Sequence, residues 1–193
     1  MASSGARGGR YAWQLVAVLA FAATAAVAVV VARPRVPAVA AGGTACTAAG
    51  LHAKVGLAAP AGTAIPRTVY YRLALTNVSD RTCVLDGYPG VEALTGARPV
   101  GSPAALDTSV RPVAVTLTPG ATAYTLLRYT TTQSFRPAMC RQVTASDLRI
   151  SPPHGASGML VQWQNPACSR PGPSFLSVQA IQPRMGEYGS PRP

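Results

Sequence analysis

The sequence predicts an all-β protein, an Ig-like antiparallel β-sandwich stapled by two disulfides and preceded by one N-terminal transmembrane helix. Three observations support this prediction. Apolar and polar residues alternate in several short segments, which is the pattern of half-buried strands. The 193 residues include 18 Gly and 18 Pro, which argues against long helices beyond the N-terminus. Four cysteines without a Cys-x-x-Cys spacing, and only two histidines, favour disulfides over a zinc site.

The N-terminal segment is expected to reach a membrane. Residues 1–10 are small and polar with two arginines, and we expect them in the cytoplasm. Residues 11–32 contain an apolar run that is longer than the core of a usual signal peptide, so they predict a transmembrane anchor or uncleaved signal. A cleaved signal is the open alternative, because Ala38-Val39-Ala40 fits a cleavage site and cleavage near Ala40 would give a secreted protein.

The cysteines orient this predicted anchor. Arginines flank the apolar run on both sides, so charge alone does not decide which side is inside. An even set of four cysteines belongs in an oxidising compartment, and we therefore expect a single-pass protein of the cell membrane with an extracytoplasmic C-terminal domain. Residues 33–45, rich in Pro, Ala and Gly, predict a linker. Cys46 lacks the leucine that a lipoprotein signal places three residues upstream, so we expect no lipid there.

The β-sandwich is expected over residues 46–182. Its clearest strand is 68–76, where Val69, Tyr71, Leu73 and Leu75 alternate with the other side chains. Further strands are expected at residues 51–58, 82–91, 113–117, 121–129, 142–150, 159–163 and 175–181. Pro119-Gly120 stands between two of them like the turn of a hairpin. Residues 183–193 have no apolar periodicity and predict a disordered tail.

Residues 82–91 form the predicted structural centre. Val84 and Leu85 suit a half-buried strand, and Gly87-Tyr88-Pro89-Gly90 predicts a tight reversal of the chain. The turn residues Tyr88 and Pro89 are also a candidate interaction site, since an aromatic side chain on a tight turn can anchor a partner. The competing interpretation is that the Tyr88 ring packs against the end of the sandwich.

The cysteines and one asparagine leave alternatives open. Our preferred pairing is sequential, Cys46 with Cys83 and Cys140 with Cys168, but four cysteines allow two other pairings. Asn77-Val78-Ser79 matches a glycosylation acceptor. Asn and Ser at the end of a strand also bind the local backbone, and this turn role is the interpretation we prefer.

Several of these segments occur together in one known family. They are Cys46, Leu75-Thr76-Asn77-Val78-Ser79, the string from Cys83-Val84-Leu85-Asp86 to Gly87-Tyr88-Pro89-Gly90-Val91, Leu117-Thr118-Pro119-Gly120, Cys140 and Cys168. With them, residues 46–182 resemble the actinobacterial family catalogued as domain of unknown function 4232. The resemblance implies an exported or membrane-attached envelope protein with one β-rich domain, and it transfers no catalytic residues.

The positive charge is spread along the chain. The net charge is +11, but residues 46–182 carry eleven Lys and Arg against five Asp and Glu, without a run of cations or interleaved aromatic residues. We therefore predict no nucleic-acid partner. A mildly basic surface suits an anionic envelope polymer, and a protein partner of unknown identity stays open. The N-terminal helix would contact the membrane.

The search for catalytic residues finds no convincing set. Ser157, His154 and Asp147 could compose a triad, but a Gly-x-Ser-x-Gly elbow is absent. Acids for a carboxylate pair are few: Asp80, Asp86, Glu92, Asp107 and Asp147. A groove for carbohydrate or peptide would need aromatic residues, and the candidates are Trp163, Tyr129, Tyr124 and Phe175, although aromatic residues on alternating strands are mostly core.

These observations together predict a protein that is not an enzyme and needs no cofactor or metal. It would be a non-catalytic extracytoplasmic envelope protein, a module for binding or scaffolding with an unknown ligand. The alternative from another class is a secreted hydrolase that acts on a cell-wall or peptide substrate through His154 or a pair of acids.

Overall fold

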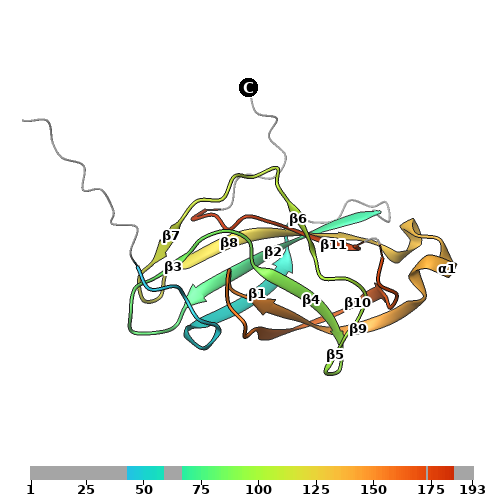
Figure 1. The fold of residues 1–193 in the computed structure, drawn as a ribbon, viewed down its shortest axis with the longest axis horizontal. Coiled ribbons are helices and arrows are strands. Elements are labelled where there is room, and N and C mark those ends of the chain that lie inside the picture. The colour runs from blue at the N-terminus through green and yellow to red at the C-terminus, as the bar shows by residue number, and fades with distance from the viewer. Residues whose placement is uncertain (1–42, 59–66, 173, 185–193) are drawn as a thin grey trace, which may run out of the picture. The chain divides into compact units, whose positions relative to one another are not determined.

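Eleven strands and three short helical turns make up the part of the chain that the computed structural model describes, residues 43–58, 67–172 and 174–184 (Figure 1). The strands are β1 (Leu51–Leu57), β2 (Thr68–Asn77), β3 (Cys83–Leu85), β4 (Gly90–Thr95), β5 (Arg98–Pro99), β6 (Ala105–Asp107), β7 (Val115–Leu117), β8 (Thr122–Thr130), β9 (Gln142–Ser151), β10 (Met159–Cys168) and β11 (Leu176–Gln179). The helical turns are η1 (Ala48–Gly50), η2 (Thr132–Ser134) and α1 (Pro137–Cys140).

These strands form three sheets. One has five strands in the order β1-β2-β8-β11-β6, the second has four in the order β10-β9-β4-β5, and the third is the pair β3-β7. Buried side chains from all three sheets belong to one hydrophobic core. The prediction of an all-β fold is therefore confirmed for the described residues.

β2 shows how local alternation builds the larger sheet. Leu73 and Leu75 are fully buried, whereas Arg72, which precedes them on the opposite face of the strand, is exposed. β2 pairs antiparallel with β1 on one side and with β8 on the other. The leucines share the core with Leu148 and Ile150 of β9, which belongs to the four-stranded sheet. Burial of one face by this second sheet explains the period-two pattern of the sequence.

The predicted reversal at residues 82–91 does not join two paired strands. β3 and β4 flank the turn but do not pair with each other, because β3 pairs with β7 and β4 pairs with β9 and β5. The turn instead carries the chain from one sheet to another. Gly87 has a φ of 106°, a conformation that glycine adopts without strain, and its carbonyl oxygen accepts a hydrogen bond from the Ile181 N–H at 2.9 Å.

The hairpin suggested by Pro119-Gly120 is also absent. β7 and β8 lie in different sheets, and the Gly120 N–H donates to the Asn77 carbonyl oxygen at 2.8 Å. Turn residues thus indicate where the chain changes direction. The same residue types occur in hairpins and in connections that cross from one sheet to another. The partner strand is chosen by contacts that are distant in the sequence.

Two further features differ from the prediction. β11 pairs parallel with β6, so the five-stranded sheet is not antiparallel throughout as expected. β10 continues beyond the predicted end at residue 163 to Cys168, because its register with β9 shifts between Gln162 and Asn165. Such a bulge interrupts the alternation from which strands are read in a sequence.

Most of the predicted N-terminal organisation lies outside the described residues. This holds for residues 1–10, for the anchor or signal at 11–32, for most of the linker at 33–45 and for most of the tail at 183–193. Within the described ranges, no helix is both long enough and apolar enough to span a bilayer.

Candidate functional site

The candidate interaction turn is mostly packed into the domain. Pro89 is buried and Tyr88 is half-buried. The Tyr88 hydroxyl lies 3.5 Å from the Val110 carbonyl oxygen. Only part of the Tyr88 ring is therefore available to a partner, and the turn serves mainly to join sheets.

The four cysteines form the disulfides Cys46–Cys83 and Cys140–Cys168, which is the preferred sequential pairing. The first joins the beginning of the domain to β3, where backbone hydrogen bonds also link Cys46 and Val84 at 3.0 Å. The second joins the end of α1 to the end of β10. No described cysteine is left as a free thiol.

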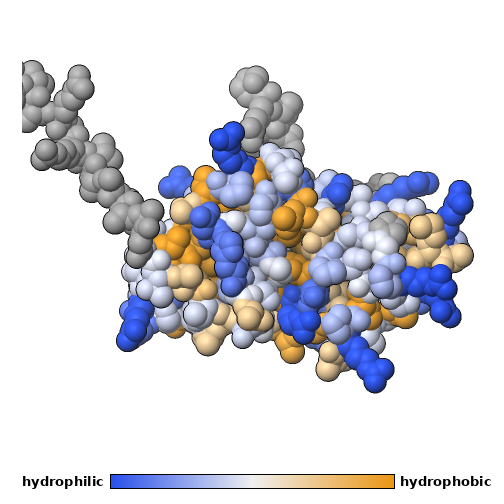
Figure 2. Space-filling model, viewed as in Figure 1, coloured by the Kyte–Doolittle hydropathy of each residue, from blue (hydrophilic) through white to orange (hydrophobic). Residues whose placement is uncertain are grey.

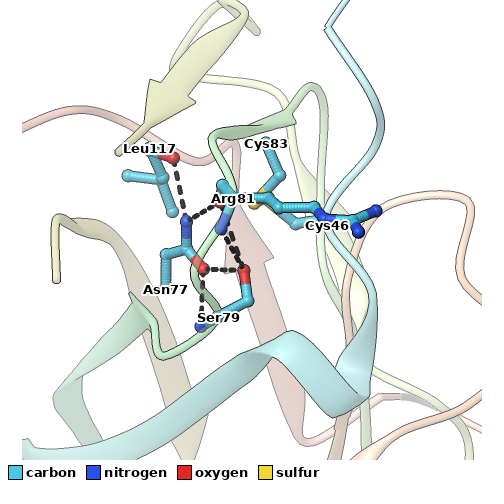
Figure 3. The surroundings of a disulfide bond; sticks show 6 residues. All are labelled: Cys46, Asn77, Ser79, Arg81, Cys83 and Leu117. Carbon is cyan, nitrogen blue, oxygen red and sulfur yellow. Dashed lines mark hydrogen bonds between the residues drawn. A yellow bond between two sulfur atoms is a disulfide. The ribbon is translucent and has the colours of Figure 1, made fainter. Parts of the chain in front are cut away.

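Asn77 lies next to the first disulfide, and its buried side chain forms hydrogen bonds to three other residues (Figure 3). Its amide nitrogen donates to the carbonyl oxygens of Arg81 at 2.7 Å and Leu117 at 2.9 Å. Its Oδ1 accepts from the backbone N–H of Ser79 at 3.0 Å and from the Ser79 hydroxyl at 2.7 Å. Both amide hydrogens are thus used inside the protein, so Asn77 has the turn role and is not a glycan acceptor in the folded domain.

The residues of the suggested triad are not assembled. His154 and Ser157 are exposed on the loop between β9 and β10, where His154 has a φ of 61°. Asp147 lies on β9 opposite Gln162, four residues before the end of that strand, which is about 13 Å along an extended chain. No hydrogen bond connects these three side chains within the described structure, so the geometry of a triad is missing.

Two of the acidic residues, Glu92 and Asp107, have structural partners that are not carboxylates. Glu92 of β4 forms an ion pair with Arg149 on the neighbouring strand β9, in which Arg149 Nε donates to Glu92 Oε2 at 2.8 Å. Asp107 Oδ1 accepts from the Ser109 N–H at 3.0 Å. Hydrogen bonding to Ser109 holds the pKa of Asp107 below its ordinary value, the opposite of what a general acid needs. The described residues contain no group of three or more His, Cys, Asp or Glu suited to a metal ion.

The aromatic residues mostly join the two larger sheets. Trp163 is only 4% exposed, and its ring lies edge-on to Tyr71 and Tyr129 with centroid distances of 6.0 Å and 5.3 Å. Tyr129 also contacts the buried Phe175. The core interpretation is therefore correct for these side chains, and they do not line a groove. Tyr124 is half-buried and pairs with Ala74 of β2.

Burial changes the chemistry of one of these tyrosines. Desolvation raises the pKa of Tyr129 from 10.0 to about 12, with a smaller contribution from Tyr71. The neutral hydroxyl donates to the Pro166 carbonyl oxygen of β10 at 2.8 Å. Tyr129 thus acts as an uncharged link between the five-stranded and four-stranded sheets.

The exposed surface offers positive charge without matching acids. The described residues include twelve Lys and Arg against five Asp and Glu. Only two ion pairs occur among them, Arg149–Glu92 and the loose contact of 4.0 Å between Arg81 and Asp80. The other ten cations in the described ranges are exposed and have no carboxylate within 4.0 Å.

Four of these cations lie at one end of the domain, which we name the arginine end: Arg67, Arg136, Arg141 and Arg170. All four are exposed. The Arg170 N–H donates to the Cys140 carbonyl at 3.4 Å, and the Arg67 carbonyl accepts from the Thr131 N–H at 2.9 Å, so three separate segments meet here. Figure 2 shows strongly hydrophilic side chains projecting from the end of the domain where Figure 1 places α1.

Residues 46–182 match the family model DUF4232, which is described as a domain of unknown function. The chain belongs to the DUF4232 family. No curated protein and no solved structure matches the chain. The DUF4232 domain of this chain is thus the β-rich domain with both disulfides, and the family description assigns it no activity.

The arginine end of this DUF4232 domain lies far from where the described chain begins. Residue Ala45 is bridged to Val84 of β3, near Asn77 at the end of β2. Arg67 directly precedes the first residue of the same strand. Ten residues of strand separate these ends, which corresponds to roughly 30 Å. The cations and the chain entry therefore lie at opposite ends of the domain (Figure 1).

The arginine end is a site that the sequence did not reveal. Its members are separated by up to about one hundred positions, and each stands alone among uncharged neighbours. The signal that was present is local: Arg136 and Arg141 flank Cys140, and Arg170 follows Cys168 by two positions. The Cys140–Cys168 disulfide brings these three arginines together.

Proposed function

We propose that the DUF4232 domain is a non-catalytic binding module of the extracytoplasmic envelope and that its ligand is an anionic envelope polymer. The observation that carries this proposal is the excess of exposed cations without carboxylate partners in the described domain. Long-range attraction by such a surface raises the local concentration of polyanions and speeds their association.

The side chains support binding rather than catalysis. His154, Ser157 and Asp147 are not connected to one another in the described domain, and Glu92 and Asp107 already have partners. A hydrolase would need a nucleophile or a general base held against an oriented partner. The secreted hydrolase is therefore the less favoured of the two functions.

The proposed compartment rests on the disulfides. Two disulfides in a small domain fit an oxidising exterior, and the apolar run within residues 11–32 has the length of an anchor. We place the DUF4232 domain outside the membrane in a single-pass arrangement. We also class its two larger sheets, which share one core, as an Ig-like sandwich with a parallel pair at one edge.

The test is a binding and turnover experiment with the full-length chain purified in detergent. We expect it to be retained on isolated anionic wall polymer at about 0.05 M salt and released by about 0.5 M salt, because salt screens the interaction. No soluble fragments should be released from the polymer during the incubation.

Substitutions at the suggested catalytic residues complete this test. His154→Ala and Asp147→Asn should leave the retention unchanged. If the wild-type chain released fragments and these substitutions abolished that release, the protein would be a hydrolase. Failure of the wild-type chain to bind any polyanion at low salt would reject the proposed function.

A further inference from the structure

We infer that the arginine end is the recognition site of the DUF4232 domain and that its ligand is a linear phosphodiester polymer. This inference rests on the proposed function, since it assigns the place and the chemical class of the binding. It is argued from the backbone that carries the arginines, from their chemistry and from their position in the domain.

The backbone under the arginines is held firmly. The Arg136 carbonyl oxygen accepts from the N–H groups of Met139 at 2.9 Å and Cys140 at 3.1 Å. The Arg141 N–H donates to the Pro137 carbonyl at 3.0 Å, and Arg141 itself ends the helix with a φ of 45°. The disulfide to Cys168 closes the same turn. Guanidinium groups on such a fixed base lose less freedom on binding than groups on a mobile loop.

The chemistry favours phosphate oxygens. A guanidinium presents a planar set of N–H donors that binds phosphate in a bidentate manner and stays charged at every physiological pH. Residues 130–142 and 166–172 contain no Asp or Glu that would compete for these donors. The arginine end is thus a surface of cationic donors, and these two segments contain no carboxylate that competes for them.

The same segments fit a phosphodiester chain better than an acidic sugar polymer. Recognition of sugar rings usually needs exposed aromatic faces and acceptors for hydroxyl groups. Phe135 is the one aromatic residue in residues 130–142 and 166–172, and it packs against the core. The cations of these segments recognise the charges of a polymer, and these segments offer no further aromatic ring to stack on its sugar rings.

The spread of the arginines favours a polymer over a single ion. Arg67, Arg136 and Arg170 belong to separate segments and are all exposed. Several of them can be engaged at once only by a ligand with several charges. A chain with one phosphodiester per repeat meets this condition, and each additional contact lowers the dissociation rate.

A membrane surface is the ligand that competes with the polymer for the arginine end. The described chain enters the domain beside β3, at the end opposite to the arginines (Figure 1). Met139, which is 52% exposed between the arginines, would suit a lipid surface, so vesicles belong in the test.

Two triple variants of the full-length protein with equal charge test the inference. The site variant is Arg136→Gln, Arg141→Gln and Arg170→Gln, and the matched control is Arg72→Gln, Arg98→Gln and Arg111→Gln, which are exposed positions elsewhere. Gln keeps the β-carbon at position 141 and so adds no new backbone strain. Retention of both disulfides and an unchanged far-ultraviolet spectrum show that each variant is folded.

Binding to synthetic poly(glycerol phosphate) is then measured at low salt. We expect the affinity of the site variant to fall roughly tenfold or more, from the loss of three charge-assisted contacts, and that of the control to fall about twofold or less. Polygalacturonate of the same length should bind the wild-type protein more weakly. Vesicles of phosphatidylglycerol and phosphatidylcholine should not compete with the polymer.

Different failures have different meanings. Equal losses in the two variants would overturn the arginine end as the site but leave the proposed function intact. Equal or tighter binding of polygalacturonate would overturn the phosphodiester assignment, and vesicle binding that is lost in the site variant would replace the polymer with a lipid surface. Absence of binding to any polyanion would remove the proposed function together with this inference.

Discussion

Asn77 shows how much a single buried polar side chain can organise. It is fully buried, and it connects the end of β2 to Arg81, Leu117 and Ser79 by side-chain hydrogen bonds. These partners lead to the Cys46–Cys83 disulfide and to β7 (Figure 3). A buried amide with every polar atom bonded specifies one arrangement of the surrounding turns.

Replacing Asn77 by Ala should lower the free energy of unfolding by about 2–4 kcal/mol, because it leaves buried backbone groups without partners. Ser79→Ala is the comparison, since it removes a half-buried hydroxyl and should cost about 1 kcal/mol. Urea denaturation measures both. An Asn77 variant that is no less stable than the Ser79 variant would contradict the role described here.

The raised pKa of Tyr129 predicts that the folded domain loses stability in alkali. Its pKa is raised to about 12 in the folded domain by burial, against 10.0 ordinarily, so its contribution to stability is complete below pH 10 and is lost as the pH rises through about 12. Denaturation curves between pH 9 and pH 12 should follow this loss, and tyrosinate absorbance should report a late-ionising residue.

In Tyr129→Phe the loss of stability at alkaline pH should be smaller. The part that remains should come from Tyr71, whose pKa is also raised by burial. An unchanged pH dependence in the variant would contradict the assignment.

At the level of elements, the two disulfides secure opposite ends of the domain. Cys46–Cys83 ties the chain entry to β3, and Cys140–Cys168 ties α1 to the end of β10. They span 37 and 28 positions of the sequence. Closing loops of this size restricts the unfolded chain, which is the main source of their stabilisation in the chain-entropy model.

Replacing either pair by serines should lower the free energy of unfolding by about 4 kcal/mol. The two variants should differ in binding: Cys140→Ser with Cys168→Ser frees the backbone of the arginine end and should weaken polymer binding, whereas Cys46→Ser with Cys83→Ser should not. Denaturation and binding are both measured at a temperature where each variant is folded. Equal binding by the two variants would argue against a rigid arginine end.

At the level of the whole molecule, the anchor and the compartment can be tested together. The intact mass of the protein from its native membranes should correspond to the full chain, and the mass gained on reduction should correspond to two disulfides. A chain shortened to near Ala40 would replace the anchor with a cleaved signal. Four free thiols in the native protein would contradict the oxidising compartment.

Features that depend on neighbouring residues could be predicted before the fold was known. Alternation predicted the bounds of β2, β8 and β9 within a residue or two. Apolar and polar residues alternate along a strand that buries only one face, so this pattern can be read from neighbouring residues. The cysteine count predicted disulfides, and Asn77 was correctly read as a turn residue. Each of these depends on chemistry within a few positions of the chain.

Strand pairing and the meeting of distant charges depend on the three-dimensional fold. The split between β3 and β4, the parallel pairing of β6 with β11, and the bulge that leaves Trp163 buried all depend on strands that are distant in the sequence. The arginine end likewise exists only because the Cys140–Cys168 disulfide and the start of β2 meet at one end of the domain. Packing between segments that are distant in the sequence sets these contacts. The local pattern of apolar and polar residues does not indicate which segments pack together.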